Sequence, residues 1–183
     1  MSRAPVLVHA SRTHGFALAI ALLAGCAGQT EGPTFEAANA DRVLAAVREP
    51  GARAVLVNVW ATWCPPCRAE FPDLMRVERE LRAEGLRMVL VSADFDESLP
   101  QARAFLAEHG VGFPSYHKTG DDMTFINTLD SLWSGALPAT LLYDGAGRRV
   151  RFWEGRQSYE TLSQAVRQVL QKGRETDSME VKS

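Results

Sequence analysis

The chain has 183 residues, of which 46% are hydrophobic and 23% are charged. That length and composition fit one globular domain and exclude a largely disordered chain. The formal net charge of -2 gives no reason to expect a nucleic-acid partner. The three cysteines, Cys26, Cys64 and Cys67, are too few for a disulfide scaffold or a four-cysteine zinc site, and we expect no metal and no cofactor.

The N-terminal residues have the pattern of a bacterial export signal. A basic start precedes an apolar run at 15–24, which is too short to span a bilayer comfortably. The run ends in Leu-Ala-Gly-Cys26, which resembles the lipoprotein signal, where cleavage precedes a cysteine that then receives lipid. We therefore expect a lipoprotein signal peptide at 1–25, a lipid-anchored tether at 26–34, and a periplasmic-side location in the bacterial cell envelope. Ordinary cleavage near Cys26, which leaves a soluble protein, is the alternative.

Strand and helix patterns alternate through the rest of the chain. Residues 54–60 form a near-continuous apolar run, typical of a strand buried on both faces. The helix that follows Cys64 is expected to reach about Glu84, where Gly85 supplies its stop, and Pro72 should kink its first turns. Residues 171–183 are charged and lack aromatic side chains, which predicts a disordered tail. The other expected elements are helices at 40–47, 99–110, 121–132 and 159–170 and strands at 87–92, 139–143 and 148–154.

This order of elements predicts the fold class. Strands that alternate with helices, followed by a hairpin and a closing helix, indicate an α/β domain at 35–170. Its mixed central β-sheet should be flanked by helices on both faces. The turn Asp-Gly-Ala-Gly at 144–147 is typical of the hairpin that joins the last two strands.

The most informative motif is Trp63-Cys64-Pro65-Pro66-Cys67, at the junction of the expected strand 54–60 and the helix after it. Cysteines separated by two residues can form and break a disulfide with little backbone movement. The first thiol would lie at a helix N-terminus, where peptide dipoles favour the thiolate that attacks disulfides. The pattern therefore predicts a dithiol redox site. Half of a structural metal site is the other interpretation, but the sequence has no second cysteine pair.

The sequence resembles the membrane-anchored, extracytoplasmic TlpA/ResA group of thioredoxin-like proteins. Residues 58–72, Asn-Val-Trp-Ala-Thr-Trp-Cys-Pro-Pro-Cys-Arg-Ala-Glu-Phe-Pro, and residues 135–140, Gly-Ala-Leu-Pro-Ala-Thr, carry the resemblance. Together with the expected elements, it covers residues 35–170. It implies a thioredoxin fold and a thiol–disulfide oxidoreductase, often one that works as a reductant outside the cytoplasm.

The resemblance also implies roles for individual residues. Cys64 would attack the substrate disulfide, and Cys67 would resolve the mixed disulfide. Pro138 matches the family's cis-proline, whose loop faces the disulfide and pairs with an extended substrate segment. The two prolines between the cysteines lack N–H donors, which limits hydrogen bonding to the Cys64 thiolate and favours a reductant. The expected substrate-binding residues are Trp63, Pro65, Pro66 and Pro138.

The proton acceptor beneath the cysteines stays open at the level of the sequence. Asn58 stands where cytosolic thioredoxins have a buried aspartate, and an asparagine cannot exchange protons at ordinary pH. Glu70, about a turn and a half beyond Cys64, is expected on a solvated helix face. Trp133 is expected either to wall the substrate groove or to pack in the core. The carboxylates that could assist Cys67 instead are Asp94, Asp96, Asp121 and Asp130.

These features predict an enzyme, an extracytoplasmic thiol–disulfide oxidoreductase that reduces protein disulfides. The family resemblance implies protein substrates such as apocytochrome c or copper-site proteins, and an extracytoplasmic electron donor that restores the dithiol. Two alternatives are a thiol peroxidase, a class that shares the fold, and a copper(I)-binding protein that uses both thiolates. In peroxidases of this fold a threonine precedes the cysteine by three positions, whereas Thr62 precedes Cys64 by two.

Overall fold

The structure, a computed structural model, describes residues 34–180, with side chains described as far as Glu175. The expected signal peptide, Cys26 and the tether up to residue 33 lie outside the described residues, as do residues 181–183. Between residues 34 and 180, no helix has both the length and the apolar character that a membrane crossing needs.

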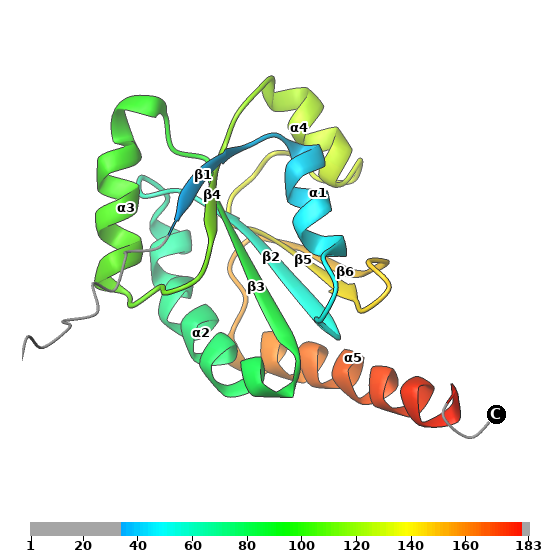
Figure 1. Cartoon of the computed structure of the whole chain (residues 1–183). Coiled ribbons are helices and arrows are strands. Elements are labelled where there is room, and N and C mark those ends of the chain that lie inside the picture. Colours follow the sequence, from blue (N-terminus) through cyan, green and yellow to red (C-terminus); the bar gives the residue numbers. More distant parts are fainter. Residues whose placement is uncertain (1–33, 181–183) are drawn as a thin grey trace, which may run out of the picture. The chain divides into compact units, whose positions relative to one another are not determined.

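A mixed sheet forms the centre of the described domain (Figure 1), as the sequence predicts, and it has six strands. Its strand order is β1-β4-β3-β2-β5-β6. The first four strands in that order pair parallel to one another. Strand β5 pairs antiparallel with β2 and with β6. The strands are β1 (Phe35–Ala38), β2 (Ala54–Trp60), β3 (Leu86–Ser92), β4 (Ser115–Lys118), β5 (Ala139–Asp144) and β6 (Arg149–Glu154).

Helices cover both faces of the sheet, which confirms the predicted layers (Figure 1). One buried cluster lies under α2, α3 and α5, and the other lies under α1 and α4. Strand β2 contributes to both, because successive side chains point to opposite faces: Leu56 belongs to the first cluster and Val57 to the second. The helices are α1 (Ala40–Arg48), α2 (Pro65–Leu81), α3 (Leu99–Glu108), α4 (Asp122–Leu129) and α5 (Tyr159–Glu180).

Helix α2 has the predicted length. It runs without a break through Pro72 to Leu81, and a 3-10 turn at Arg82–Glu84 completes it. Gly85 ends the turn with a φ of 106°, a left-handed backbone conformation that favours glycine. The predicted stop at this glycine is therefore confirmed.

Two short strands are missing from the sequence-based prediction, and one helix end was predicted too early. Strands β1 and β4 have four residues each, and β4 reads Ser-Tyr-His-Lys, which lacks an apolar alternation. They form because β1 pairs with β4 and β4 pairs with β3, contacts that local sequence does not reveal. Helix α5 continues past the predicted end at Leu170, so the first part of the expected tail is helical as far as Glu180.

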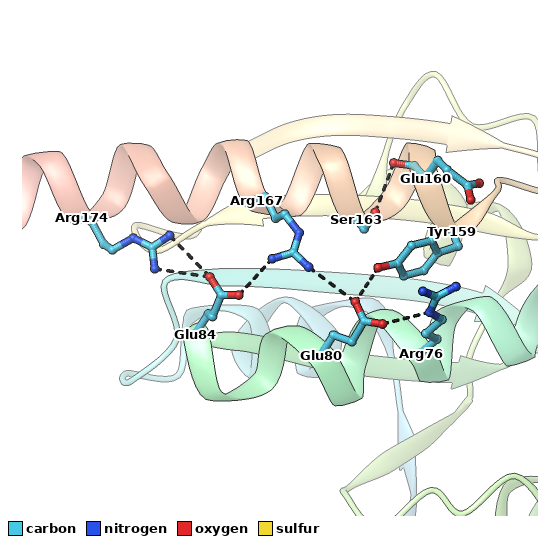
Figure 2. Close-up of polar contacts among 8 residues, drawn as sticks. All are labelled: Arg76, Glu80, Glu84, Tyr159, Glu160, Ser163, Arg167 and Arg174. Carbon is cyan, nitrogen blue, oxygen red and sulfur yellow. Dashed lines mark hydrogen bonds and ion pairs between the residues drawn. The ribbon is translucent and has the colours of Figure 1, made fainter.

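A row of polar contacts joins α2 to α5 on the surface (Figure 2). The Tyr159 hydroxyl donates a hydrogen bond to Glu80, for example. Exposed contacts of this kind contribute roughly 1 kcal/mol or less each, so the buried side chains Leu162, Val166 and Leu170 beneath them carry most of the attachment of α5. The side chains of the row are Arg76, Glu80, Glu84, Tyr159, Arg167 and Arg174.

We expect Leu162→Ala to lower the free energy of unfolding by about 2–5 kcal/mol, because the deleted atoms leave a cavity in a packed cluster. Leu162 has 0% exposure in the folded domain. Gln164→Ala, at an exposed position of the same helix, is the matched control and should change stability by less than about 0.5 kcal/mol. Urea denaturation of the oxidised protein measures the stability of both variants. Equal effects would contradict the conclusion that the buried side chains of α5 carry most of its attachment.

Candidate active site

The cysteine pair lies at the junction of β2 and α2. Cys64 is the N-cap of α2, with extended backbone, and forms a disulfide with Cys67 across 5.3 Å between their Cα atoms. The backbone N–H of Cys67 donates to the Cys64 sulfur at 3.3 Å. Since Pro65 and Pro66 have no N–H, this is the first donor that the helix start can offer, as the sequence predicts.

The loop before Cys64 is held in place by Asp94. Its carboxylate accepts hydrogen bonds from the Thr62 backbone N–H at 3.1 Å and from the Thr62 hydroxyl at 2.5 Å. The hydroxyl of Ser92 donates to the same carboxylate at 2.7 Å. Asp94 therefore positions the loop that follows β2, and its oxygens are occupied by these donors.

The segment that contains Pro138 lies at the same edge of the sheet. The Leu137–Pro138 peptide bond is cis, as the family resemblance implied. Ala139, the next residue, pairs with Val59 near the end of β2, so Pro138 sits beside the point where the chain leaves β2 towards Cys64. The strands thus bring together two motifs that are about seventy residues apart in the sequence.

Contacts with β6 hold the residues that precede Pro138. The backbone N–H and the hydroxyl of Ser134 both donate to Glu154, at 3.1 and 2.5 Å. Asp130 forms an ion pair with Arg149. Trp133 is 6% exposed and belongs to a buried cluster, so it packs in the core, and it also lines a groove beside the site.

Glu70 lies in a different environment from the one that the sequence predicts. It was expected on a solvated helix face, but it has 0% exposure. The Asn58 side chain donates to Glu70 Oε1 at 2.9 Å, and the backbone N–H of Gln157 donates to Oε2 at 2.5 Å. These donors allow the burial, because a buried carboxyl group without hydrogen bonds is very costly.

Burial raises the pKa of Glu70 to about 7, although the hydrogen bonds from Gln157 and Asn58 oppose the shift. Glu70 follows Cys67 by three residues, so the two side chains lie on the same face of α2. A carboxyl group with such a pKa can take up or release a proton near neutral pH, whereas Asn58 cannot. Glu70 is therefore the best candidate for the proton acceptor that serves Cys67.

The other carboxylates considered from the sequence have different surroundings. Asp121 caps α4 by accepting the Thr124 N–H at 2.8 Å, while Asp94 and Asp130 have the partners described above. Asp96 is exposed. The three-residue spacing from Cys67 is the sequence feature that could have identified Glu70, since it places the side chain beside a buried cysteine.

The exposed members of the expected site surround the cysteines. Trp63 is 54% exposed, and its ring stacks on Phe95 with 6.3 Å between the ring centres. Pro65 and Pro66 are exposed on the first turn of α2, whereas Cys64 and Cys67 are buried. Within residues 34–180, no cluster of three or more histidine, cysteine, aspartate or glutamate side chains could hold a metal ion.

Comparisons with known proteins find a matching family and several relatives. Residues 29–151 match the model of the AhpC/TSA family. The chain is 38% identical over 103 residues to a thiol:disulfide interchange protein DsbE homolog from Paracoccus denitrificans, covering 56% of this chain and 50% of the relative. It is 29% identical over 109 residues to the thiol-disulfide oxidoreductase ResA of Halalkalibacterium halodurans, covering 60% of this chain and 58% of the relative. The chain thus matches only 50–58% of the length of these relatives.

A solved structure shows the same fold. The thiol:disulfide interchange protein, a thioredoxin family protein from Chlorobium tepidum, superimposes with a TM-score of 0.59 at 24% sequence identity. The match covers 76% of this chain and 94% of that chain. The fold is therefore the predicted thioredoxin fold.

The raised pKa of Glu70 makes stability depend on pH. An unfolded glutamate loses its proton near pH 4.5, but the buried one keeps it until about pH 7. The protonated Glu70 side chain therefore contributes about 3 kcal/mol to the free energy of unfolding below about pH 4.5, and this contribution is lost as the pH rises through about 7. Glu70→Gln has no proton to lose and should remove this part of the pH dependence.

Urea unfolding of the oxidised protein between pH 4 and 8 tests this expectation. Glu108→Gln, at an exposed position at the end of α3, is the matched control and should keep the wild-type profile. If Glu70→Gln and the wild type lose stability in parallel across that range, Glu70 does not titrate as described.

Proposed function

The chain belongs to the AhpC/TSA family, and we propose that it is an extracytoplasmic thiol–disulfide oxidoreductase that reduces protein disulfides. The observation that carries the proposal is the Cys64–Cys67 disulfide at the start of α2, with the buried Glu70 carboxyl three residues beyond Cys67. The names of the relatives, thiol:disulfide interchange protein and thiol-disulfide oxidoreductase, support the same reaction.

The proposed reaction begins with the reduced pair. The Cys64 thiolate attacks one sulfur of the substrate disulfide, a mixed disulfide forms, and the other substrate sulfur leaves as a thiolate. Cys67 then loses its proton to the Glu70 carboxylate and attacks the Cys64 sulfur. The second substrate thiolate leaves, and the Cys64–Cys67 disulfide forms. Two electrons pass from the dithiol to the substrate, so a separate electron donor outside the cytoplasm must reduce the pair again.

The proposed substrates are proteins with exposed disulfides, with apocytochrome c and copper-site proteins as the candidates that the family resemblance implies. Trp63, Pro65, Pro66 and Pro138 are the proposed substrate-binding residues. The first three are exposed beside the cysteines, and Pro138 lies at the adjacent sheet edge.

We expect Cys64→Ser to lose reduction of insulin disulfides by at least roughly 100-fold, because it removes the attacking thiolate. Cys67→Ser should instead accumulate the mixed disulfide, since nothing resolves it. In the reduced wild type, iodoacetamide should modify Cys64 before Cys67, because Cys64 caps the helix. It should do so at a pH well below about 8.5, the pKa of a free thiol. Non-reducing gels and mass spectrometry measure the adducts.

Three outcomes would contradict this scheme. Faster alkylation of Cys67 would reverse the roles of the two cysteines. Rapid consumption of hydrogen peroxide without disulfide reduction would favour a thiol peroxidase. Stoichiometric copper that is lost on Cys64→Ser would favour a copper(I)-binding protein.

The lipid anchor is a separate proposal, which rests on the sequence that ends in Cys26. We expect the wild-type protein from its bacterial host to partition into the membrane fraction, because several acyl chains on one cysteine hold firmly. Cys26→Ser should move the protein to the soluble fraction while leaving disulfide reduction unchanged. A soluble wild-type protein whose Cys26 carries no lipid by mass spectrometry would contradict the anchor.

A further inference from the structure

A groove of about 560 Å³ opens beside the cysteine pair, at the carboxyl ends of the parallel strands β2, β3 and β4. Ligand sites of proteins with parallel strands commonly form at this edge. Trp63, which precedes Cys64, and Leu137, which precedes Pro138, both line the groove. The groove therefore begins next to both parts of the proposed active site.

Two large aromatic side chains lie exposed at this groove. Trp63 is 54% exposed and Phe95 is 66% exposed, and their rings stack with an angle of 21° between the ring planes. Exposed apolar surface beside a site is typical of a surface that a partner covers. The face of a tryptophan or phenylalanine ring also attracts an arginine or lysine side chain, which packs its aliphatic part on the ring.

Carboxylates outnumber cations among the residues that line the groove. Lys118 supplies the one positive charge of this lining, and its Nζ lies 2.5 Å from the carboxylate of Asp122. Asp96 and Glu97 are exposed, and neither has an ion pair with a cation in the described part of the chain. We refer to this feature, with Trp63, Phe95, Asp96 and Glu97 at its rim, as the acidic groove.

We propose that the acidic groove binds a cationic segment of the substrate protein, in which an arginine or lysine lies close in sequence to the cysteine that Cys64 attacks. This inference rests on the proposed function and adds a substrate preference to it. The uncompensated carboxylates of Asp96 and Glu97 attract such a segment and repel an acidic one. The rings of Trp63 and Phe95 provide the surface on which the cationic side chain packs.

Two synthetic peptides with one disulfide each test the preference. They are identical except that the residues next to one cysteine are arginines in the first and glutamates in the second. The reduced full-length protein should reduce the arginine peptide at least about tenfold faster at low ionic strength, and the difference should shrink as salt is added. Rates are normalised to those with bis(hydroxyethyl) disulfide, which is small and neutral, and equal rates for the two peptides would overturn the proposal.

Variants locate the preference in the molecule. Asp96→Asn combined with Glu97→Gln should reduce the ratio of the two rates to about twofold or less, since both free carboxylates are gone. Asp41→Asn combined with Glu108→Gln removes the same charge from exposed positions on α1 and α3, and should keep the wild-type ratio. If this control lowers the ratio as much, the net charge of the protein is responsible and the groove is not the site.

Binding without reaction separates this inference from the proposed function. A cysteine-free arginine peptide should change the tryptophan fluorescence of the oxidised protein, because Trp63 lies at the groove, and Phe95→Ala should weaken that binding. Absence of binding would overturn the proposed role of the acidic groove, even if the protein reduces disulfides. Failure to reduce any of the three disulfides would overturn the proposed function, while the fluorescence measurement still decides the groove.

Discussion

The arrangement of the site depends on the hydrogen bonds that the buried carboxyl group of Glu70 accepts. It accepts hydrogen bonds from Asn58 on β2 and from the backbone of Gln157, just before α5. The Asn58 side chain also donates to Thr140 at 2.9 Å, on β5 and two residues after Pro138. One carboxyl group thus connects the helix that carries the cysteines with the strand that follows Pro138. Loss of either donor would leave a buried polar group unsatisfied, at a cost of roughly 1–3 kcal/mol.

The chain is held in place both before and after Gln157, which fixes the position of the Gln157 backbone N–H. On the side of the sheet, the N–H of Gly155 donates to the carbonyl of Pro138 at 2.8 Å. On the side of the helix, Tyr159 donates to Glu80 in the row of contacts that joins α5 to α2 (Figure 2). The segment between β6 and α5 is therefore attached to the Pro138 loop and to α2 at once. Surface contacts that contribute little to stability can in this way hold a backbone N–H against a buried carboxyl group.

Much of the fold could be predicted because its signals are local. The apolar run of β2, the start of α2 at the cysteine motif and the stop at Gly85 depend on neighbouring residues, and all three are found where expected. Strands β1 and β4 could not be predicted in that way, since four residues carry little pattern and their pairing partners are remote in sequence.

The same limit explains the error at Glu70. Its inward position follows the stripe of Cys67, Phe71 and Leu74 on α2, which was available in the sequence. A glutamate on that stripe is buried only if donors reach it, and those donors come from positions 12 and 87 residues away. The prolines and cysteines of the motif were recognised from their spacing, whereas the carboxyl group depends on pairing that only the folded sheet provides.

The environment of Glu70 also limits how charge can change in the proposed reaction. A buried thiolate and a buried carboxylate side by side would place two like charges in an apolar cluster, which is strongly unfavourable. If Glu70 takes up the proton that Cys67 releases, the negative charge moves from oxygen to sulfur and the total does not increase. Asp96 and Glu97 stand outside the cluster, where water screens their charge and a cationic substrate can reach it. The inner carboxyl group is thus suited to proton transfer and the outer ones to recognition, because burial raises the pKa of Glu70 and exposure leaves the charges of the outer pair accessible.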